Sequence, residues 1–182
     1  MPNLKAFSPS GPPYRMATQE CPCGHLGDPR KACSCSPMQI AAYMARLSGP
    51  LMDRLDIQIQ VPALDFDELS KPPISEPSSS VRERVNAARQ AQTARLKPGQ
   101  THLYCNAQMG PREIREHCGV DDDGTRLLRL AVERLGLSAR GFDRLLKVSR
   151  TIADLDGDKA ILPKHLAEAI QYRSLDRAGV PA

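Results

Sequence analysis

The chain has 182 residues, a formal net charge of +4, 41% hydrophobic residues and 4% aromatic residues, with no tryptophan. The length suits one domain with an appended piece, and the charge is too small to indicate a nucleic-acid binder by itself. The core must therefore be aliphatic, which favours helices. Because no apolar run approaches the roughly 20 residues of a membrane span and the N-terminus lacks a signal-peptide pattern, we expect a cytoplasmic protein without a membrane partner.

Stretches rich in Pro, Gly and Ser divide the chain. Residues 1–20 show no hydrophobic periodicity and predict a disordered lead-in. Residues 63–80 predict a linker, because their prolines and serines prevent regular structure. We therefore expect two structured parts, 21–62 and 81–177, followed by a short tail at 178–182.

Four of the six cysteines form two C-x-C pairs near the N-terminus. Cys21 and Cys23 make the first pair, and Cys33 and Cys35 make the second. In a reducing compartment clustered cysteines bind metal more often than they form disulfides. Four thiolates at about 2.3 Å from Zn²⁺ make a closed tetrahedral site, with no open position for catalysis. The spacing favours a structural zinc site, with free thiols or a bare loop as alternatives and His25 as a substitute ligand.

A helix and a strand are predicted after the cysteines. Ser36 suits the N-cap of the helix, Pro37 suits its first position, and apolar residues recur at helical spacing up to Gly49. The segment "LDIQIQV", residues 55–61, alternates apolar and polar residues and ends at Pro62. This alternation is typical of a half-buried strand.

Asp53 and Arg54 lie between this helix and this strand. A guanidinium held at the end of an element is suited to clamp a phosphate, because its planar fork matches the oxygens. A surface ion pair is the commoner explanation of such a string. The local sequence does not decide between the two.

Helices dominate the rest of the chain. Ser80 and Glu83 predict a capping box that opens a helix running to about Leu96. Further helices are expected from about Pro111, Asp123, Ser138 and Pro163. The apolar spacing predicts that residues 81–177 form a bundle of four to five helices joined by short turns.

Basic residues in this part offer two further candidates. Arg140 lies in the first turn of the helix after Ser138, where the helix dipole favours an anion. The helix that follows the linker is basic on several sides, which suits contact with nucleic-acid phosphates. Its cationic residues are Arg82, Arg84, Arg89, Arg95 and Lys97. For both candidates a solvated helix face is the simpler reading.

Several catalytic signatures are missing from these 182 residues. The chain contains no G-x-x-x-x-G-K-[ST] loop, no apolar strand ending in adjacent acids, no G-x-S-x-G and no H-E-x-x-H. Whether the chain is an enzyme is therefore uncertain from its sequence.

The order of motifs nevertheless resembles a known family. The motifs are "CPCGHLGDPRKACSCSPMQIAAYMARLSGPLMDRLDIQIQVP", "VRERVNAARQAQ", "NAQM", "AVERLGLSARGFDRLLKVSRTIADLDG" and "HLAEAIQYR". In this order they are similar to the C-terminal part of the magnesium-chelatase-like AAA+ ATPases of bacteria, the ComM competence-protein group. The resemblance covers roughly residues 21–177.

This resemblance implies a mainly α fold, in which a helical lid bundle follows a cysteine-rich loop and the helix-strand end of the α/β ATPase core. It implies a homo-hexameric motor that uses ATP and Mg²⁺ between neighbouring subunits and acts on DNA in natural transformation. By position, Arg54 matches the arginine finger that reaches the neighbouring γ-phosphate, and Asp53 would orient its loop. Arg140 matches the lid arginine, the second sensor, which contacts nucleotide in its own subunit.

The resemblance has limits. Where the family has an Asn-Pro that senses the γ-phosphate, this chain has Gln19 and Glu20, and both Walker motifs are absent from it. We therefore expect a C-terminal portion that does not hydrolyse ATP alone. The alternative hypothesis is a stand-alone, zinc-stabilised DNA-binding module without ATPase activity.

Overall fold

The structure is a computed structural model that describes residues 17–28, 30–46, 49–52, 54–62, 64, 66, 70, 75–96 and 103–173. These residues form two compact units. The first unit contains residues 17–46 and 60–70, and the second contains 49–59 and 75–173. Asp53, Lys97, the tail and most of the predicted lead-in and linker lie outside the described residues.

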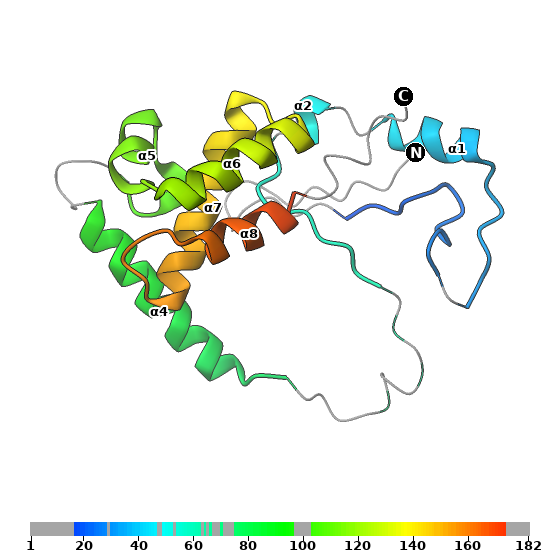
Figure 1. Cartoon of the computed structure of the whole chain (residues 1–182). Helices are drawn as coiled ribbons and strands as arrows, with labels where there is room; N and C mark the ends of the chain where they lie inside the picture. The colour runs from blue at the N-terminus through cyan, green and yellow to red at the C-terminus, as the bar shows by residue number, and fades with distance from the viewer. Residues whose placement is uncertain are drawn as a thin grey trace. The chain divides into compact units, whose positions relative to one another are not determined.

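The described residues are mainly helical, which confirms the predicted fold class (Figure 1). The helices are α1 (Pro37–Met44), α2 (Gly49–Met52), α4 (Ser78–Arg95), α5 (Pro111–His117), α6 (Asp122–Leu135), α7 (Ala139–Asp156) and α8 (Pro163–Gln171), with a 3₁₀ turn η1 (Asn106–Gln108). Across the ranges described, none of these helices is long and apolar enough to cross a bilayer.

The described residues of the first unit include the cysteine loop, α1 and a short segment that begins at residue 60. Ser36 caps α1 as predicted: its hydroxyl accepts a hydrogen bond from the Gln39 N–H, and the Gln39 side chain accepts one from the Ser36 N–H. No residue of α1 is buried. The amide of Gln60 donates to the Glu20 carboxylate at 2.6 Å within this unit.

The predicted strand at 55–61 is not formed. Residues 55–61 form no regular element, and no strand is present among the described residues, which contain one isolated parallel bridge between Val120 and Ile161. A strand requires a hydrogen-bonded neighbour, whatever its alternation of apolar and polar residues. Its alternate apolar side chains, Ile57, Ile59 and Val61, stay exposed instead.

The predicted capping box at Ser80 is also wrong. Helix α4 begins at Ser78, Pro77 occupies its N-cap position, and no side chain caps it. An N-cap residue needs an extended backbone, which Pro77 supplies with ψ at 142°, whereas Ser80 already lies inside the helix. The residues in the first half of α4 are all exposed, and burial begins at Ala88 and Gln92.

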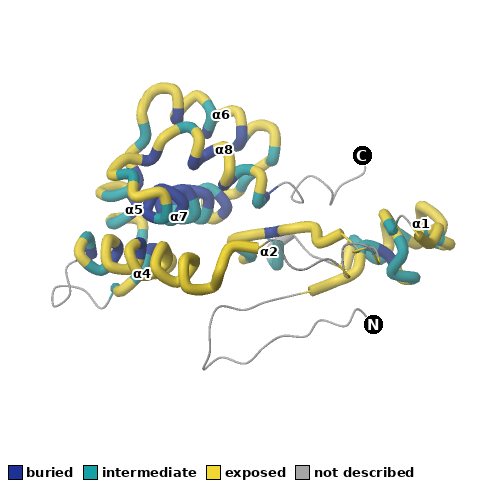
Figure 2. Tube along the Cα trace, turned by 90° about the horizontal axis from the view of Figure 1, so that it is seen from below, coloured by how far each residue is buried: buried dark blue, intermediate teal, exposed yellow. Residues whose placement is uncertain are grey.

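Helix α7 is the centre of the second unit. It packs against α8, α4, η1 and α5, while α6 packs on α8. Figure 2 shows that buried residues concentrate on α7. Ser138 caps its start by accepting from the Gly141 N–H at 3.0 Å, and Gly157 ends it in the left-handed conformation that glycine tolerates, with φ of 76°. The fully buried apolar side chains around it include Met109, Leu145, Leu166, Ile161 and Ala169.

A buried polar network fixes the helices around α7. The Asp154 carboxylate accepts two hydrogen bonds from Arg95 of α4, one from Arg150 at 3.1 Å and one from Asn106 of η1 at 2.8 Å. Arg150 in turn donates to the carbonyls of Asp158 and Lys159 in the loop after α7. One carboxylate therefore ties α4, η1 and α7 together, and Arg150 extends the network to the turn that leads into α8.

We expect Asp154→Ala to lower the free energy of unfolding by about 3–5 kcal/mol, because it leaves two partly or fully buried arginines without their carboxylate. Asp154→Asn keeps the shape but not the charge and should recover only part of this loss. Urea unfolding of the full chain, followed by helical circular dichroism, measures the change. Asp156→Ala removes an exposed carboxylate from the same helix and should cost no more than about 1 kcal/mol. A similar loss for both alanine variants would contradict the network's importance.

The same network predicts an acid dependence. Burial of Asp154 opposes its ionisation, but hydrogen bonds from Arg95 and Asn106 and the charge of Arg150 outweigh it and lower its pKa below the ordinary 3.8. A depressed pKa in the folded state gives stability that is present above the unfolded-state pKa and is lost as pH falls through the folded-state pKa. The stability difference between wild type and Asp154→Asn should thus be constant near neutral pH and shrink below pH 3.8. A difference that stays constant down to the end of the acid titration would contradict this prediction.

Candidate functional site

The four clustered cysteines converge on one point in the first unit. The Sγ atom of Cys21 lies 3.4 Å from that of Cys23 and 3.7 Å from that of Cys33, and Cys23 and Cys33 are 3.5 Å apart. All four sulfurs, including that of Cys35, lie within 4.8 Å of one another. A tetrahedral ion with metal–sulfur bonds of about 2.3 Å requires sulfurs about 3.8 Å apart. The cluster thus has the spacing of a four-thiolate metal site.

The loop conformation brings the two pairs together. Gly24 and Gly27 adopt φ of 78° and 77°, values that side chains with a Cβ rarely adopt. The Gly24 N–H donates to the Cys21 carbonyl at 3.2 Å, which closes a tight turn around the first pair. The backbone N–H of Cys35 points at the Cys33 sulfur at 3.5 Å. Such N–H groups stabilise negative charge on cysteine sulfur.

The electrostatics of the thiols also suit a cation. Backbone hydrogen bonds from His25 and Ser34 lower the pKa of Cys23 to about 5. The N–H of Cys35 favours the Cys33 thiolate, but burial and the neighbouring sulfurs outweigh it and raise the pKa of Cys33 to about 12. Cys23 is therefore the first of these thiols to ionise. Ionisation of a second cysteine beside it is unfavourable unless a bound cation compensates the added negative charge.

His25 is not part of this cluster. Its Nδ1 atom lies 3.4 Å from a carboxylate oxygen of Asp28, and Asp28 also accepts from the Arg30 N–H at 2.8 Å. The sequence allowed His25 to replace one sulfur, but the structure pairs it with Asp28 and leaves the metal-type cluster to cysteines alone.

Arg54 is exposed in the turn that follows α2, where its N–H donates to the Leu51 carbonyl at 3.0 Å. Asp53, predicted to orient it, lies outside the described residues. The residues that follow Arg54 are held by the helical unit. Arg173 donates to the Leu55 carbonyl at 2.9 Å, and the Gln58 N–H donates to the Tyr172 carbonyl at 2.8 Å.

Arg140 is exposed in the first turn of α7, as the sequence predicted. One turn later on the same helix, Arg144 forms an ion pair with Asp56, two residues after Arg54. The structure therefore places Arg54 and Arg140 in one unit, on segments joined by a direct contact.

The sequence did not identify the residues that make these contacts. Asp56 lay in the predicted strand, and neither Arg144 nor Arg173 was assigned a role. Arg173 is the largest fully buried side chain among the described residues, at 1% exposure. No local pattern marks such an arginine, because its partner, the Leu55 carbonyl, is 118 residues away in the chain.

A second cluster with metal-ligand chemistry lies at the start of α8 but does not suit a metal. The His165 Nε2 atom lies 3.2 Å from Asp156 and 3.1 Å from Asp158. However, the His165 Nδ1 atom accepts from the Leu162 N–H at 2.9 Å, so the ring proton of a neutral imidazole sits on Nε2, the nitrogen that would have to bind the metal. Lys164 supplies the cation instead, at 2.8 and 2.9 Å from the two carboxylates.

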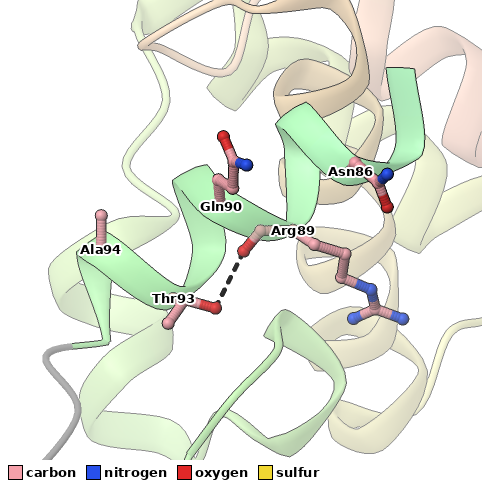
Figure 3. Close-up of a pocket in the computed structure, with 5 residues that line it drawn as sticks. All are labelled: Asn86, Arg89, Gln90, Thr93 and Ala94. Atoms are coloured by element: carbon pink, nitrogen blue, oxygen red, sulfur yellow. Dashed lines mark hydrogen bonds between the residues drawn. The ribbon is translucent and has the colours of Figure 1, made fainter. Parts of the chain in front are cut away.

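The basic residues of α4 are partly used within the second unit. Arg95 is bound to Asp154, and Arg84 forms an ion pair with Glu76 at 3.0 Å. Figure 3 shows a hollow beside this helix whose described lining residues, Asn86, Arg89, Gln90, Thr93 and Ala94, all belong to α4. Because no second described element contributes a group, this hollow has no converging chemistry.

Two family models match this chain. "Magnesium chelatase, subunit ChlI C-terminal" matches residues 75–173, which contain α4 to α8. "Magnesium chelatase, subunit ChlI" matches residues 9–69, which contain the cysteine cluster and Arg54. These matches confirm the predicted resemblance.

Curated relatives agree with the family models. The chain is 43% identical to "Competence protein ComM" of Haemophilus influenzae over 143 residues, 78% of this chain and 27% of the relative. It is 42% identical to "Uncharacterized protein YifB" of Escherichia coli over 144 residues, 79% of this chain and 27% of the relative. It is 34% identical to "Uncharacterized protein Rv2897c" of Mycobacterium tuberculosis over 159 residues, 87% of this chain and 30% of the relative. The chain therefore spans less than a third of the length of these relatives.

Proposed function

We propose a function from the premise that this chain belongs to the magnesium chelatase, subunit ChlI family, whose C-terminal model matches more than half of it. In this proposal the second unit is the helical lid of an AAA+ motor, and the chain supplies two arginines to nucleotide sites that use ATP and Mg²⁺. The single observation that carries the proposal is the exposure of Arg54 and Arg140 on one helical unit, on segments that touch each other.

Arg54 is proposed to act as the arginine finger. Arg54 lies in a short turn, and Arg173 holds the backbone that follows it, so the backbone position of Arg54 is fixed. Its side chain is exposed and can therefore reach a neighbouring subunit. A fixed guanidinium stabilises the charge that develops on the transferred phosphoryl group, and such a residue contributes about 10³–10⁵ to turnover in other nucleotide hydrolases. Asp53 is proposed to orient the same turn.

Arg140 is proposed to contact nucleotide in its own subunit. It lies two residues after the N-cap Ser138, so the guanidinium and the positive end of the α7 dipole attract the same anion. In α7 it shares a rigid helix with the core of the unit. A phosphate bound at Arg140 would therefore be sensed by the whole helical lid.

The assembly and its substrate are further parts of the proposal. We infer a cytoplasmic homo-hexamer that acts on DNA, because an arginine finger needs a neighbouring subunit and because one relative carries the name "Competence protein ComM". Within it, Cys21, Cys23, Cys33 and Cys35 would hold one Zn²⁺ that closes the loop of the first unit. The cytoplasm keeps thiols reduced and available for such an ion.

The stand-alone DNA-binding module is the weaker candidate. It relied on the basic residues of α4, but Arg95 is committed to Asp154 and Arg84 is neutralised by Glu76. The remaining described cations of that helix, Arg82 and Arg89, form too small a field for tight phosphate binding on their own.

The ATPase role can be tested by complementation. The full chain is mixed with a full-length relative whose arginine aligned with Arg54 has been replaced by alanine, and ATP turnover is measured. We expect no turnover from the chain alone and restored turnover in the mixture. Arg54→Ala in the chain should abolish the restoration, by roughly 10³-fold.

The control for this assay is Arg126→Ala, which removes an equally charged, exposed side chain from α6 and should leave the restored turnover unchanged. Turnover by the chain alone, or restoration that survives Arg54→Ala, would contradict the proposed role.

The zinc site predicts a defined metal content. Protein purified under reducing conditions should contain about one equivalent of zinc per chain, because four thiolates complete the coordination. Cys33→Ser should reduce this content to well under half, whereas Cys105→Ser, outside the cluster, should leave it unchanged. Elemental analysis of the purified chain measures both. Wild-type protein with less than about half an equivalent would refute the zinc proposal.

A further inference from the structure

The residues after Arg54 are attached to the helical unit at three points. The Asp56 carboxylate pairs with Arg144 of α7, the Leu55 carbonyl accepts from Arg173, and the Gln58 N–H donates to Tyr172 at the end of α8. In Figure 1 this segment, which follows α2, runs past the C-terminal end of α8. The chain that carries Arg54 is therefore part of the body formed by α7 and α8.

The first of these contacts also touches the helix that carries Arg140. Arg140 and Arg144 are four residues apart on α7, so they lie on the same face with a rise of about 6 Å between them. Asp56 thus binds α7 one turn from Arg140 and lies two residues from Arg54. The Asp56–Arg144 ion pair therefore joins the two segments that carry the proposed nucleotide-contacting arginines.

We propose that the Asp56–Arg144 ion pair couples Arg54 to helix α7, so that the lid helix sensing nucleotide through Arg140 also positions the finger offered to the neighbouring subunit. Asp56 and Arg144 are positioning residues in this scheme, because they act through Arg54. The inference rests on the proposed function of Arg54 and Arg140 and extends it. It assigns the communication between two nucleotide sites to a contact inside one chain.

The strength of the contact suits a coupling element. Arg144 is about three-quarters buried and Asp56 about half buried, with side-chain exposures of 26% and 51%. Ion pairs of this kind contribute modestly to stability, so their loss changes the position of a segment without unfolding the domain. The buried Arg173, in contrast, is unsuited to a test, because its removal would disturb the end of α8.

The anchoring is tested first on the full chain, without any assumption about ATP. Trypsin cleaves after Arg54, and mass spectrometry follows that bond alone. Arg144→Ala should increase the rate of this cleavage about two- to fivefold, the range for loss of a partly exposed ion pair. Arg126→Ala, which removes the exposed Arg126–Asp123 pair of α6, should not change it. Asp56 is kept in this assay, because it lies close to the cleaved bond and would alter recognition by the protease.

The coupling is then tested in the complementation assay. Arg144→Ala should lower kcat at least about fivefold with little change in the KM for ATP. A displaced Arg54 would stabilise the transition state less, whereas ATP binding would not depend on it. The exchanged pair, Asp56→Arg with Arg144→Asp, should restore most of kcat. Rescue by charge exchange would show that the ion pair itself is required, rather than either side chain alone.

The outcomes separate the two levels of the proposal. Unchanged cleavage after Arg54 in Arg144→Ala, or unchanged kcat while Arg54→Ala still abolishes turnover, would overturn the coupling and leave the finger intact. If Arg54→Ala itself has no effect, the proposed function fails, and the coupling that rests on it fails with it. Increased cleavage, a kcat-specific loss and charge-exchange rescue together support the coupling.

Discussion

The carboxylate of Asp154 is the contact on which the helical unit depends. It lies on the central helix α7 and accepts hydrogen bonds from Arg95, Arg150 and Asn106, which come from two helices and a 3₁₀ turn. A buried carboxylate with this many donors has little freedom, and neither have the helices that supply them. The apolar core around α7 provides most of the burial, whereas this network specifies which faces meet.

The rigidity of α7 matters for the residues at its N-terminal end. Arg140 begins the helix and Arg144 follows one turn later, in contact with Asp56. Because Arg54 and Arg140 belong to one unit, a displacement of α7 moves both. In the proposed motor the two arginines serve different nucleotides, so the unit is a mechanical connection between neighbouring sites. In that proposed motor, the packing of the segment after Arg54 on α7 and α8 would carry movement from one site to the other.

The sequence predicted most of the helices, because their start and stop signals are local. Ser138 and Gly157 bound α7 by their own side-chain and backbone chemistry, and the cysteine spacing indicated the thiol cluster. One prediction failed, and one contact was missed, where the decisive partner lies far away in the chain. The segment 55–61 has the alternation of a strand but meets a helix end in place of a sheet edge. The anchoring role of Arg173 depends on the Leu55 carbonyl, 118 residues away in the chain, and no local sequence pattern indicates such a contact.

The central claim is that the Arg54 segment belongs to the same cooperative body as α7 and α8. Native-state hydrogen exchange of the full chain tests it most directly, through the Gln58 amide that donates to the Tyr172 carbonyl at 2.8 Å. The claim predicts that this amide is protected and loses its protection at the same denaturant concentration as the amides of α8, as members of one cooperative unit do. Exchange of the Gln58 amide at the rate of an exposed loop, while α8 remains protected, would contradict it.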